Sequence, residues 1–429
     1  MERDLMKSLV EWKTDEYRKP LLIRGARQVG KSWLVREFSK LFENFVEINF
    51  EKTKSFHHFF AGDLNIEFIL EKLALHTGTK IKEGQTLLFL DEIQVCEGAI
   101  KALRYFKEEN PLLHVIAAGS LLDFALEKIG LPVGRVQFLY LYPMSFGEYL
   151  NSLNLNNWRL AIRKKNIDET MHKNLLEHLK NYMWLGGMPE VIFAWIKDKD
   201  PSKCQKIQDE IIDSYQIDFH RYAKQHQIPY VSKTFERIPA FIGKKFIYSH
   251  IETGVRNEPI KQALQLLEKA SIAKLCYHTS AQKPPLGSEI NEKKFKVFFF
   301  DIGLMHRILG FNYKNWSKNP GQTSFQGEMA EQLVAQEWMA YSPNHRPSQL
   351  FYWHREAKNS NAEVDFIFDI NGEIVPIEVK SGATGKMLSM KIYLESHHSS
   401  LKGIKISQSP FGQDGKIDFY PLYAMESIY

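Results

Sequence analysis

The segment Gly25-Ala26-Arg27-Gln28-Val29-Gly30-Lys31-Ser32 decides how the first part of this chain folds. It has the form Gly-x-x-x-x-Gly-Lys-Ser and lies between an apolar strand pattern, KPLLIR at 19–24, and a helical pattern, WLVREFSKLF at 33–42. A strand, a glycine-rich turn and a helix in this order are the context that a P-loop requires. The glycines let backbone N–H groups converge on phosphate oxygens at the positive end of the helix. The segment therefore predicts a site for the phosphates of a nucleotide.

Two carboxylates further along the chain supply the rest of the chemistry that such a site needs. An apolar strand pattern at 86–92, TLLFLDE, ends in Asp91 and Glu92. We expect Lys31 to reach the outer phosphates, and we expect the Ser32 hydroxyl and Asp91 to bind Mg²⁺, Asp91 either directly or through water. Glu92 would polarise the attacking water.

Five strand patterns alternate with helical patterns in the first 150 residues. They predict a parallel sheet that is covered on both faces by helices and binds its ligands at the carboxyl ends of the strands. Asp91 and Ser120 both fall at such ends. The five patterns span 19–24, 44–50, 86–92, 114–118 and 136–141.

Length and composition narrow the class of protein. The chain has 429 residues, more than one hydrophobic core usually fills, which favours about three domains. The most apolar run, Leu112–Leu122, has about half of the roughly 20 residues that a membrane-spanning helix needs. Three cysteines lie far apart and form no Cys-x-x-Cys pair. These features predict a cytoplasmic protein without a membrane segment, a disulfide framework or a structural zinc site.

The first 200 residues resemble a known family. The segments GARQVGKS, LLFLDEIQ, AAGS, Gly134-Arg135 before LYPMSFGEYL, and GGMPE are similar to AAA+ type ATPases of bacteria and archaea that carry an uncharacterised C-terminal domain. The resemblance implies that the nucleotide is ATP and that Ser120 is a sensor near the γ-phosphate. It also makes Arg135 a candidate finger that stabilises charge on the transferred phosphoryl group.

The residues alone leave the role of Arg135 open. It could equally be a surface arginine beside a turn. A finger could act in its own chain or on a neighbour, so a monomer and an oligomer both remain open.

Charge is unevenly distributed, although the whole chain carries only +5. Residues 1–150 carry 20 Lys+Arg against 21 Asp+Glu, residues 151–320 carry 27 against 17, and residues 321–429 carry 9 against 13. The net charges are therefore −1, +10 and −4. A basic middle segment is typical of contact with a polyanion such as DNA, and equally of solvated, lysine-rich helix faces.

The basic middle segment contains the order of elements of a winged helix. After a mainly helical stretch at 151–222, helical patterns at 231–242 and 258–269 precede strand patterns at 272–277 and 294–301. The second helix of such a module commonly enters the DNA major groove while basic residues hold phosphates. A winged helix that serves only as a rigid connector is the alternative. The candidate DNA contacts are Lys244, Lys245, Arg256, Lys261 and Lys269.

The last segment looks like the restriction-endonuclease fold. A helical pattern at 325–340 precedes strand patterns at 349–354, 363–369 and 374–380, and a helix at 386–395 and a strand at 403–406 follow. Alternation along two of the strands puts acidic and basic side chains in phase on one sheet face. These in-phase residues are Glu363, Asp365, Glu378 and Lys380.

Nuclease members of that fold use an Asp, a Glu-x-Lys pair and a helical Glu. The resemblance implies that Asp365 and Glu378 bind Mg²⁺, that Lys380 orients water or stabilises the pentavalent phosphate, and that Glu328 assists the metal. The net charge of −4 and Val364, which replaces the usual proline, argue against assuming cleavage. A retained fold used for binding is the alternative.

Together these patterns predict an α/β multidomain protein. Its parts would be a P-loop ATPase core at 1–150, a helical lid at 151–222, a winged-helix-like domain at 223–320 and a nuclease-like domain at 321–429. We expect Mg²⁺-dependent ATP binding and hydrolysis coupled to movement of the last two domains, with DNA as a partner. The rivals are an ATP-gated DNA nuclease and a nucleotide-dependent switch that binds a protein and scarcely turns over.

Overall fold

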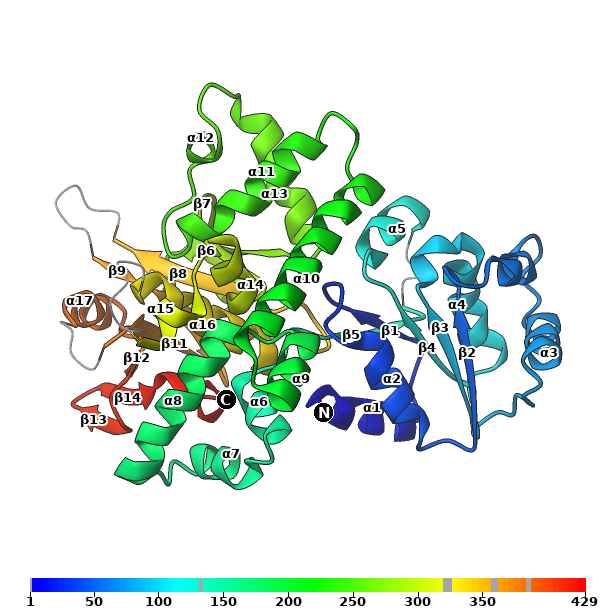
Figure 1. The fold of residues 1–429 in the computed structure, drawn as a ribbon, viewed down its shortest axis with the longest axis horizontal. Coiled ribbons are helices and arrows are strands. Elements are labelled where there is room, and N and C mark those ends of the chain that lie inside the picture. The colour runs from blue at the N-terminus through cyan, green and yellow to red at the C-terminus, as the bar shows by residue number, and fades with distance from the viewer. Residues whose placement is uncertain (1, 131–133, 319–325, 356–361, 383–386) are drawn as a thin grey trace. The chain divides into compact units, whose positions relative to one another are not determined.

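A computed structural model describes residues 2–130, 134–318, 326–355, 362–382 and 387–429. The chain divides into two compact units (Figure 1). The N-terminal unit contains Glu2–Tyr142 and the distant segment Pro343–Pro347. The C-terminal unit contains Pro143–Ser342 and Ser348–Tyr429, so it includes most of the predicted lid, winged-helix-like and nuclease-like segments. Their division into separate domains stays a prediction. In the described ranges, every helix is too short or too polar to cross a membrane.

The N-terminal unit is built on a five-stranded parallel sheet of order β2-β3-β4-β1-β5 (Figure 1). The prediction of a parallel sheet from five strands is confirmed, and β4 has the predicted bounds. The strands are β1 (Leu21–Arg24), β2 (Asn44–Asn49), β3 (Thr86–Asp91), β4 (His114–Ala118) and β5 (Gln137–Tyr140).

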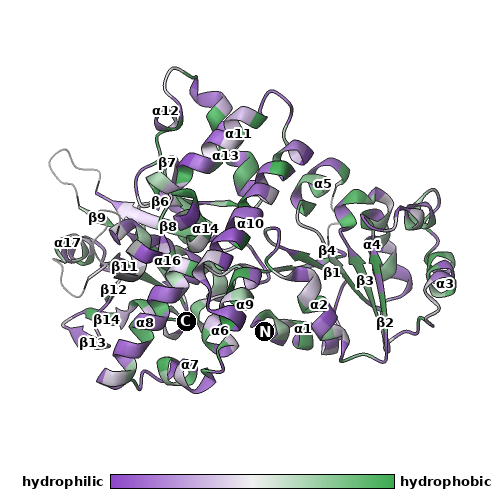
Figure 2. Ribbon diagram, in the orientation of Figure 1, coloured by the Kyte–Doolittle hydropathy of each residue, from purple (hydrophilic) through white to green (hydrophobic). Residues whose placement is uncertain are grey.

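Helices cover both faces of this sheet because its central strands are apolar on both sides. Every residue of β3 and β4 is buried, and Figure 2 shows these strands in the colour of hydrophobic residues. Leu88 and Leu90 pack with α3, α4 and α5. On the other face, Trp12 of α1 meets Phe38 of α2 and His114 of β4. The helices of the unit are α1 (Leu5–Thr14), α2 (Lys31–Ser39), α3 (Ile66–Thr77), α4 (Glu97–Glu109) and α5 (Leu122–Ile129), with turns η1 (Lys54–Phe60) and η2 (Ile93–Val95).

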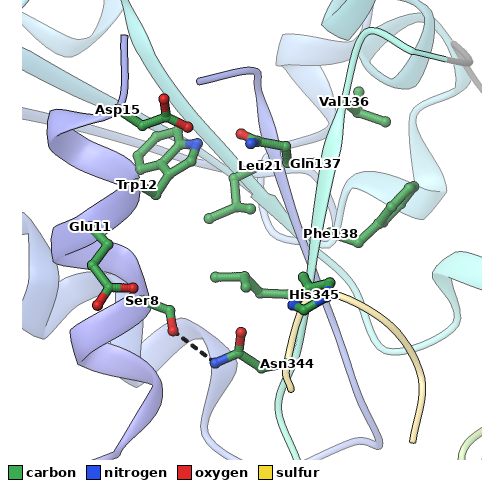
Figure 3. Close-up of a pocket in the computed structure, with 11 residues that line it drawn as sticks. Ser8, Glu11, Trp12, Asp15, Leu21, Val136, Gln137, Phe138, Asn344 and His345 are labelled. Carbon is green, nitrogen blue, oxygen red and sulfur yellow. Dashed lines mark hydrogen bonds between the residues drawn. The ribbon is translucent and has the colours of Figure 1, made fainter. Parts of the chain in front are cut away.

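The segment 343–347 joins this unit from far along the sequence, which no local pattern indicated. Tyr140 N donates to Asn344 O at 2.8 Å, and Asn344 Nδ2 donates to Ser8 Oγ at 2.8 Å. Asn344 and Ser8 border a cavity of about 560 Å³ between α1 and β5. Figure 3 shows the residues that line it. The cavity reaches Leu21 at the start of β1, so it lies at the end of the strand opposite to the P-loop.

The C-terminal unit begins with a helical region. Ser145 starts α6 with a capping box, because its side chain accepts from Glu148 N while the Glu148 carboxylate accepts from Ser145 N at 3.0 Å. In the segment MSFGEYL, the serine and the glutamate therefore start a helix. The helices are α6 (Phe146–Ser152), α7 (Asn156–Arg163), α8 (Glu169–Leu185), α9 (Pro189–Asp198), α10 (Pro201–Tyr222), α11 (Ile228–Arg237), α12 (Tyr248–Ile251), α13 (Asn257–Lys269), α14 (Ile302–Ile308), α15 (Tyr313–Lys318), α16 (Gln326–Tyr341) and α17 (Leu388–Ser396), with turns η3 (Ile238–Phe241), η4 (Leu286–Glu289) and η5 (Leu422–Ser427). Phe325 and Lys386, with which two helices were predicted to start, lie outside the described residues.

The two strands predicted for the winged helix share a sheet with strands of the last segment. β6 pairs with β7 in antiparallel fashion and with β8 in parallel fashion, in the order β7-β6-β8-β9. Ala281, Trp353 and Tyr393 belong to one hydrophobic cluster, so a common core lies beneath both segments. The strands are β6 (Ala273–Thr279), β7 (Ile290–Phe299), β8 (Leu350–His354) and β9 (Glu363–Val364).

A second sheet has the order β10-β11-β12-β14-β13. The strand predicted at 363–369 is divided between the two sheets, and this corrects the prediction of one strand. The division falls at Asp365, whose Oδ2 turns to accept a hydrogen bond from Val379 N at 2.7 Å. The strands are β10 (Phe366–Ile370), β11 (Glu373–Val379), β12 (Gly403–Ser407), β13 (Gly412–Asp414) and β14 (Ile417–Pro421).

Candidate functional site

The predicted P-loop lies between β1 and α2, at the carboxyl end of β1. Gly25 has φ +141°, and a Cβ there would come within 2.1 Å of Leu141 O, so only glycine fits. Gly30 has φ +96° and ψ +23°, a left-handed conformation that places it just before the first residue of α2. The loop between them, Ala26 to Val29, contains one further residue with positive φ, Gln28 at +63°.

Lys31 is folded back into the loop. Its Nζ donates to Gly25 O at 2.8 Å and to Ala26 O at 2.7 Å. Burial lowers the pKa of Lys31 to about 8, although the carboxylates of Glu92 and Asp91 raise it. The ammonium group is thus held among backbone carbonyls beside the start of the helix.

Ser32 and Asp91 lie in direct contact. Ser32 Oγ is 3.0 Å from both Asp91 carboxylate oxygens, and Asn49 Nδ2 donates to Asp91 Oδ2 at 3.1 Å. Burial first, and the charge of Glu92 second, raise the pKa of Asp91. A hydroxyl beside a buried carboxylate is a donor set that suits a hard cation. Asn49 was not predicted, although it ends β2 in register with Asp91 at the carboxyl edge where ligands were expected.

Glu92 follows Asp91 in an unusual backbone conformation, with φ +51° and ψ +43°. Gln94 Nε2 donates to Glu92 Oε2 at 2.6 Å. Ser120 lies two residues after the end of β4, at the same edge of the sheet as the P-loop and Asp91. Gln94 is a second residue that the sequence argument passed over, although it belongs to the quoted motif LLFLDEIQ.

Arg135 lies at the other end of the sheet. It is two residues before β5, which runs parallel to β1 with Gln137 opposite Leu21. Strand residues advance about 3.3 Å each, so about 15–20 Å separate Arg135 from Leu141, the residue beside Gly25. Arg135 Nε instead contacts Glu108 Oε1 at 2.8 Å. This placement does not fit a finger that acts on the P-loop of its own chain.

The predicted DNA contacts lie in the C-terminal unit, and their exposure differs. Lys245, Arg256 and Lys261 are exposed, whereas Lys269 is half-buried. Lys244 forms an ion pair with Glu328 at 3.3 Å. Helix α13 buries Ile260, Ala263, Leu264 and Leu267, so its apolar face packs inside the unit.

Three of the four predicted nuclease residues lie close together. Asp365 Oδ2 contacts the backbone of Val379, between Glu378 and Lys380. Lys380 Nζ donates to Glu378 Oε1 at 2.5 Å. Burial raises the pKa of Glu378 to about 7, and the charge of Asp365 adds to this effect.

A buried lysine joins this cluster from β7. Lys296 has 1% of its side chain exposed, and its Nζ lies 2.6 Å from Glu363 Oε1 and 3.3 Å from Glu331 Oε2. Burial lowers the pKa of Lys296, but the carboxylates of Glu331, Glu363 and Asp365 outweigh burial and raise it. Burial also raises the pKa of Glu331 to about 8.

Glu331 is therefore the carboxylate of α16 that contacts Lys296 in this cluster, whereas the predicted role of Glu328 stays a prediction. Both residues lie on α16, but Glu328 is three residues earlier and is paired with Lys244. The helical pattern at 325–340 did not indicate which of its carboxylates would face the strands. Among the residues that the structure describes, no three His, Cys, Asp or Glu side chains converge closely enough to hold a metal ion.

The comparisons with known proteins agree with the geometry of the N-terminal unit. A family model described as an AAA domain matches residues 17–150. This part of the chain is an AAA-type P-loop domain. The match covers the P-loop, Asp91, Glu92 and Ser120. The resemblance of this segment to AAA-type ATPases is therefore confirmed.

The remaining matches carry no stated function. Residues 176–315 and 326–423 match models described as domains of unknown function, DUF8612 and DUF4143. Neither description names a winged helix or a nuclease. An uncharacterized protein of Haemophilus influenzae is 24% identical over 336 residues, which cover 73% of this chain and 75% of that protein.

Two solved structures show a distant likeness. A Walker-type ATPase of Pyrococcus abyssi has a TM-score of 0.47 at 15% identity, covering 72% of this chain and 95% of that one. The ORC1 protein of Aeropyrum pernix, solved in complex with DNA, has a TM-score of 0.31 at 10% identity, covering 72% and 92%. Both TM-scores are below 0.5, so neither likeness bears on what this chain binds.

Proposed function

We propose that the AAA-type domain binds ATP with Mg²⁺ and hydrolyses it. The observation that carries this proposal is the contact of Ser32 Oγ with both oxygens of Asp91 at 3.0 Å, at the start of the helix that follows the P-loop. These two residues would hold the ion, which when bound neutralises charge on the phosphate oxygens. Adenine as the base is supported by the family resemblance alone.

Each residue around this contact has a separate task in the proposal. Lys31 would exchange the carbonyls of Gly25 and Ala26 for phosphate oxygens, because both carbonyls belong to the loop in which the phosphates would bind. Glu92 would accept a proton from the attacking water. Ser120 would sense the γ-phosphate from the end of β4.

Hydrolysis by the purified full chain tests the proposal, with ATP binding measured separately. Lys31→Ala should abolish hydrolysis and weaken binding, because a buried cation beside the phosphates is lost. Glu92→Gln should keep ATP binding and lose about 10²-fold to 10⁴-fold in kcat. Lys40→Ala, at the exposed end of the same helix, is the matched control and should change neither. Unaltered turnover in Glu92→Gln would remove Glu92 from its role.

We further propose that DNA binding stimulates ATP hydrolysis, and this proposal rests on the basic middle segment. Lys245, Arg256 and Lys261 are exposed and available to phosphates. DNA should then stimulate hydrolysis, and charge removal at Lys261 should reduce the salt dependence of binding by about one phosphate contact. Hydrolysis that DNA leaves unchanged would favour a nucleotide-dependent switch for a protein partner.

Metal-dependent DNA cleavage is a second candidate function with one observation in its favour. Glu378 is 5% exposed, and its Oε2 has no hydrogen-bond partner within the described residues. The cluster holds four carboxylates, those of Glu331, Glu363, Asp365 and Glu378, against the two ammonium groups of Lys296 and Lys380, which leaves a charge of −2 when all are ionised. Protons would balance that charge, and a divalent cation would do so only after these side chains move closer together, because no three of them converge on one point in the described residues.

Cleavage of linear, circular and branched DNA with Mg²⁺ and ATP decides between these two uses of the cluster. Cutting by the wild type that disappears in Asp365→Ala would establish the nuclease. No cutting, or equal cutting by both proteins, would leave the cluster as a binding scaffold and ATP hydrolysis as the chemistry of the chain.

A further inference from the structure

Gln94 lies between the residues that follow two neighbouring strands, β3 and β4, at the sheet edge where hydrolysis is proposed to occur. It lies in the turn after β3, two residues beyond Glu92. Its Nε2 donates to Glu92 Oε2 at 2.6 Å, and among the described residues it is the one side-chain donor to that carboxylate. A single short hydrogen bond therefore sets the direction of the Glu92 carboxylate.

The other end of the amide lies beside Gly119, the residue that follows β4. A Cβ on Gly119 would come within 2.0 Å of Gln94 Oε1, so the glycine before Ser120 leaves room for this side chain. The motifs LLFLDEIQ and AAGS, which lie on neighbouring strands, are thereby joined through Gln94 and Gly119. The reverse orientation of the amide would place Oε1 against the Glu92 carboxylate, which electrostatic repulsion disfavours.

Gln94 Oε1 also lacks a hydrogen-bond partner within the described part of the chain. A buried acceptor without a donor lowers the free energy of unfolding by about 1–3 kcal/mol, so this amide group does not serve to stabilise the fold. Removing it should cost the fold little. An apolar residue of the same length would remove the unsatisfied oxygen together with the contact to Glu92.

We propose that Gln94 is a positioning residue that holds the Glu92 carboxylate in the orientation from which it accepts the proton of the attacking water. Glu92 needs such support because its backbone, at φ +51°, adopts a strained conformation for a residue with a side chain. Gly119 serves the same end by leaving space for Gln94. This inference rests on the proposed ATP hydrolysis and adds the residue that aims its general base.

The test compares ATP turnover, ATP binding and thermal unfolding of the full chain for the wild type, Gln94→Met and Glu92→Gln. We expect Gln94→Met to lower kcat by about 10-fold to 100-fold, since part of the 10²-fold to 10⁴-fold effect of a general base depends on its placement. KM, the dissociation constant of ATP and the unfolding temperature should stay at the wild-type values. If Gln94 had a merely structural role, Gln94→Met would instead lower the unfolding temperature.

Two further variants examine the geometry. Gly119→Ala should lower kcat like Gln94→Met, because the new methyl group displaces the amide, and the double variant should be no slower than either single one.

The outcomes separate the two proposals. Normal kcat in Gln94→Met, combined with loss in Glu92→Gln, overturns the role of Gln94 and leaves ATP hydrolysis standing. Additive losses in the double variant overturn the link through Gly119. A wild-type chain that does not hydrolyse ATP overturns both proposals.

Discussion

Asp301 Oδ2 accepts a hydrogen bond from Gly187 N at 2.6 Å, and this bond joins two motifs that lie 114 residues apart. Asp301 ends the sequence KFKVFFFD and caps α14 through Leu304 N at 2.9 Å, whereas Gly187 belongs to GGMPE at the end of α8. Asp301 is fully buried, and burial raises its pKa to about 6. Both motifs thus have a structural task inside the C-terminal unit.

Substitution of Gly186 should be costly for this reason. Gly186 has φ +79°, and a Cβ there would come within 2.2 Å of Asp301 Oδ1. Gly186→Ala should lower the free energy of unfolding of the C-terminal unit by more than about 3 kcal/mol, from backbone strain and overpacking together. Gly310→Ala is the matched control, because Gly310 has φ +78° with open space around it, and should cost about 1–2 kcal/mol. Equal losses in urea denaturation would show that the Asp301 contact does not matter.

The buried acids of the C-terminal unit predict a loss of stability at higher pH. Glu337 accepts from Phe146 N at 3.0 Å and from Tyr182 OH at 2.9 Å, and burial raises its pKa to about 8. An acid whose pKa is higher in the folded state binds its proton more tightly there, so the stabilisation is present below about pH 4.5 and is lost as the pH rises to 8. Asp301 acts in the same direction up to about pH 6.

Urea denaturation at pH 5, 6.5 and 8 measures this dependence. We expect the midpoint of the wild type to fall between pH 5 and 8, and we expect Glu337→Gln to flatten the curve because the amide cannot ionise. Glu395→Gln, an exposed substitution in the same unit, should leave the curve unchanged. A Glu337→Gln curve parallel to that of the wild type would contradict the assignment.

The sequence predicted the fold of the N-terminal unit well because its signals are local. The P-loop needs eight consecutive residues. β3 is a largely apolar run that ends in Asp91, and β4 is a largely apolar run that precedes Gly119 and Ser120. The position of Pro343–Pro347 beside Tyr140 could not be predicted, because it depends on a pairing between segments some 200 residues apart. The same holds for the pairing of β6 with β8.

The sites were predictable to the extent that their residues are neighbours in sequence. Asp91 and Ser32 were found from their motifs, whereas Asn49 depends on which strands lie side by side. Gln94 belongs to a quoted motif, but its contact with Glu92 depends on side-chain directions that the pattern does not show. Lys296 was not among the predicted site residues, since nothing near it in sequence shows that it contacts carboxylates of α16 and β9. Its burial is a tertiary property that local patterns do not encode.

Arg135 gives a prediction about the number of chains in the active assembly. Because it lies about 15–20 Å from its own P-loop, Arg135→Ala should leave kcat within about twofold wherever light scattering shows a monomer. The lost contact with Glu108 is a surface ion pair, and such pairs contribute little to stability. A loss of turnover confined to concentrations at which chains associate would assign Arg135 to a neighbouring site. A loss in the monomer would contradict the placement described above.

Lys296 should be essential to the stability of the C-terminal unit. Its ammonium group is buried between Glu331 and Glu363, so Lys296→Met would leave several carboxylates without their cation. Breaking a buried ion pair from one side costs about 3–5 kcal/mol, and we expect a loss of this size in urea denaturation at pH 7. Lys293→Met, on an exposed position of the same strand, should cost almost nothing.

The double variant Lys296→Met with Glu331→Gln separates lost charge balance from lost packing. Removing one carboxylate together with the cation should recover part of the stability, because fewer buried charges remain uncompensated. Lowering the pH to 5 should likewise help Lys296→Met more than the wild type, since the carboxylates can then take up protons in place of the ammonium group. A Lys296→Met protein that is as stable as the wild type at pH 7 would mean that protons already balance the cluster without the lysine.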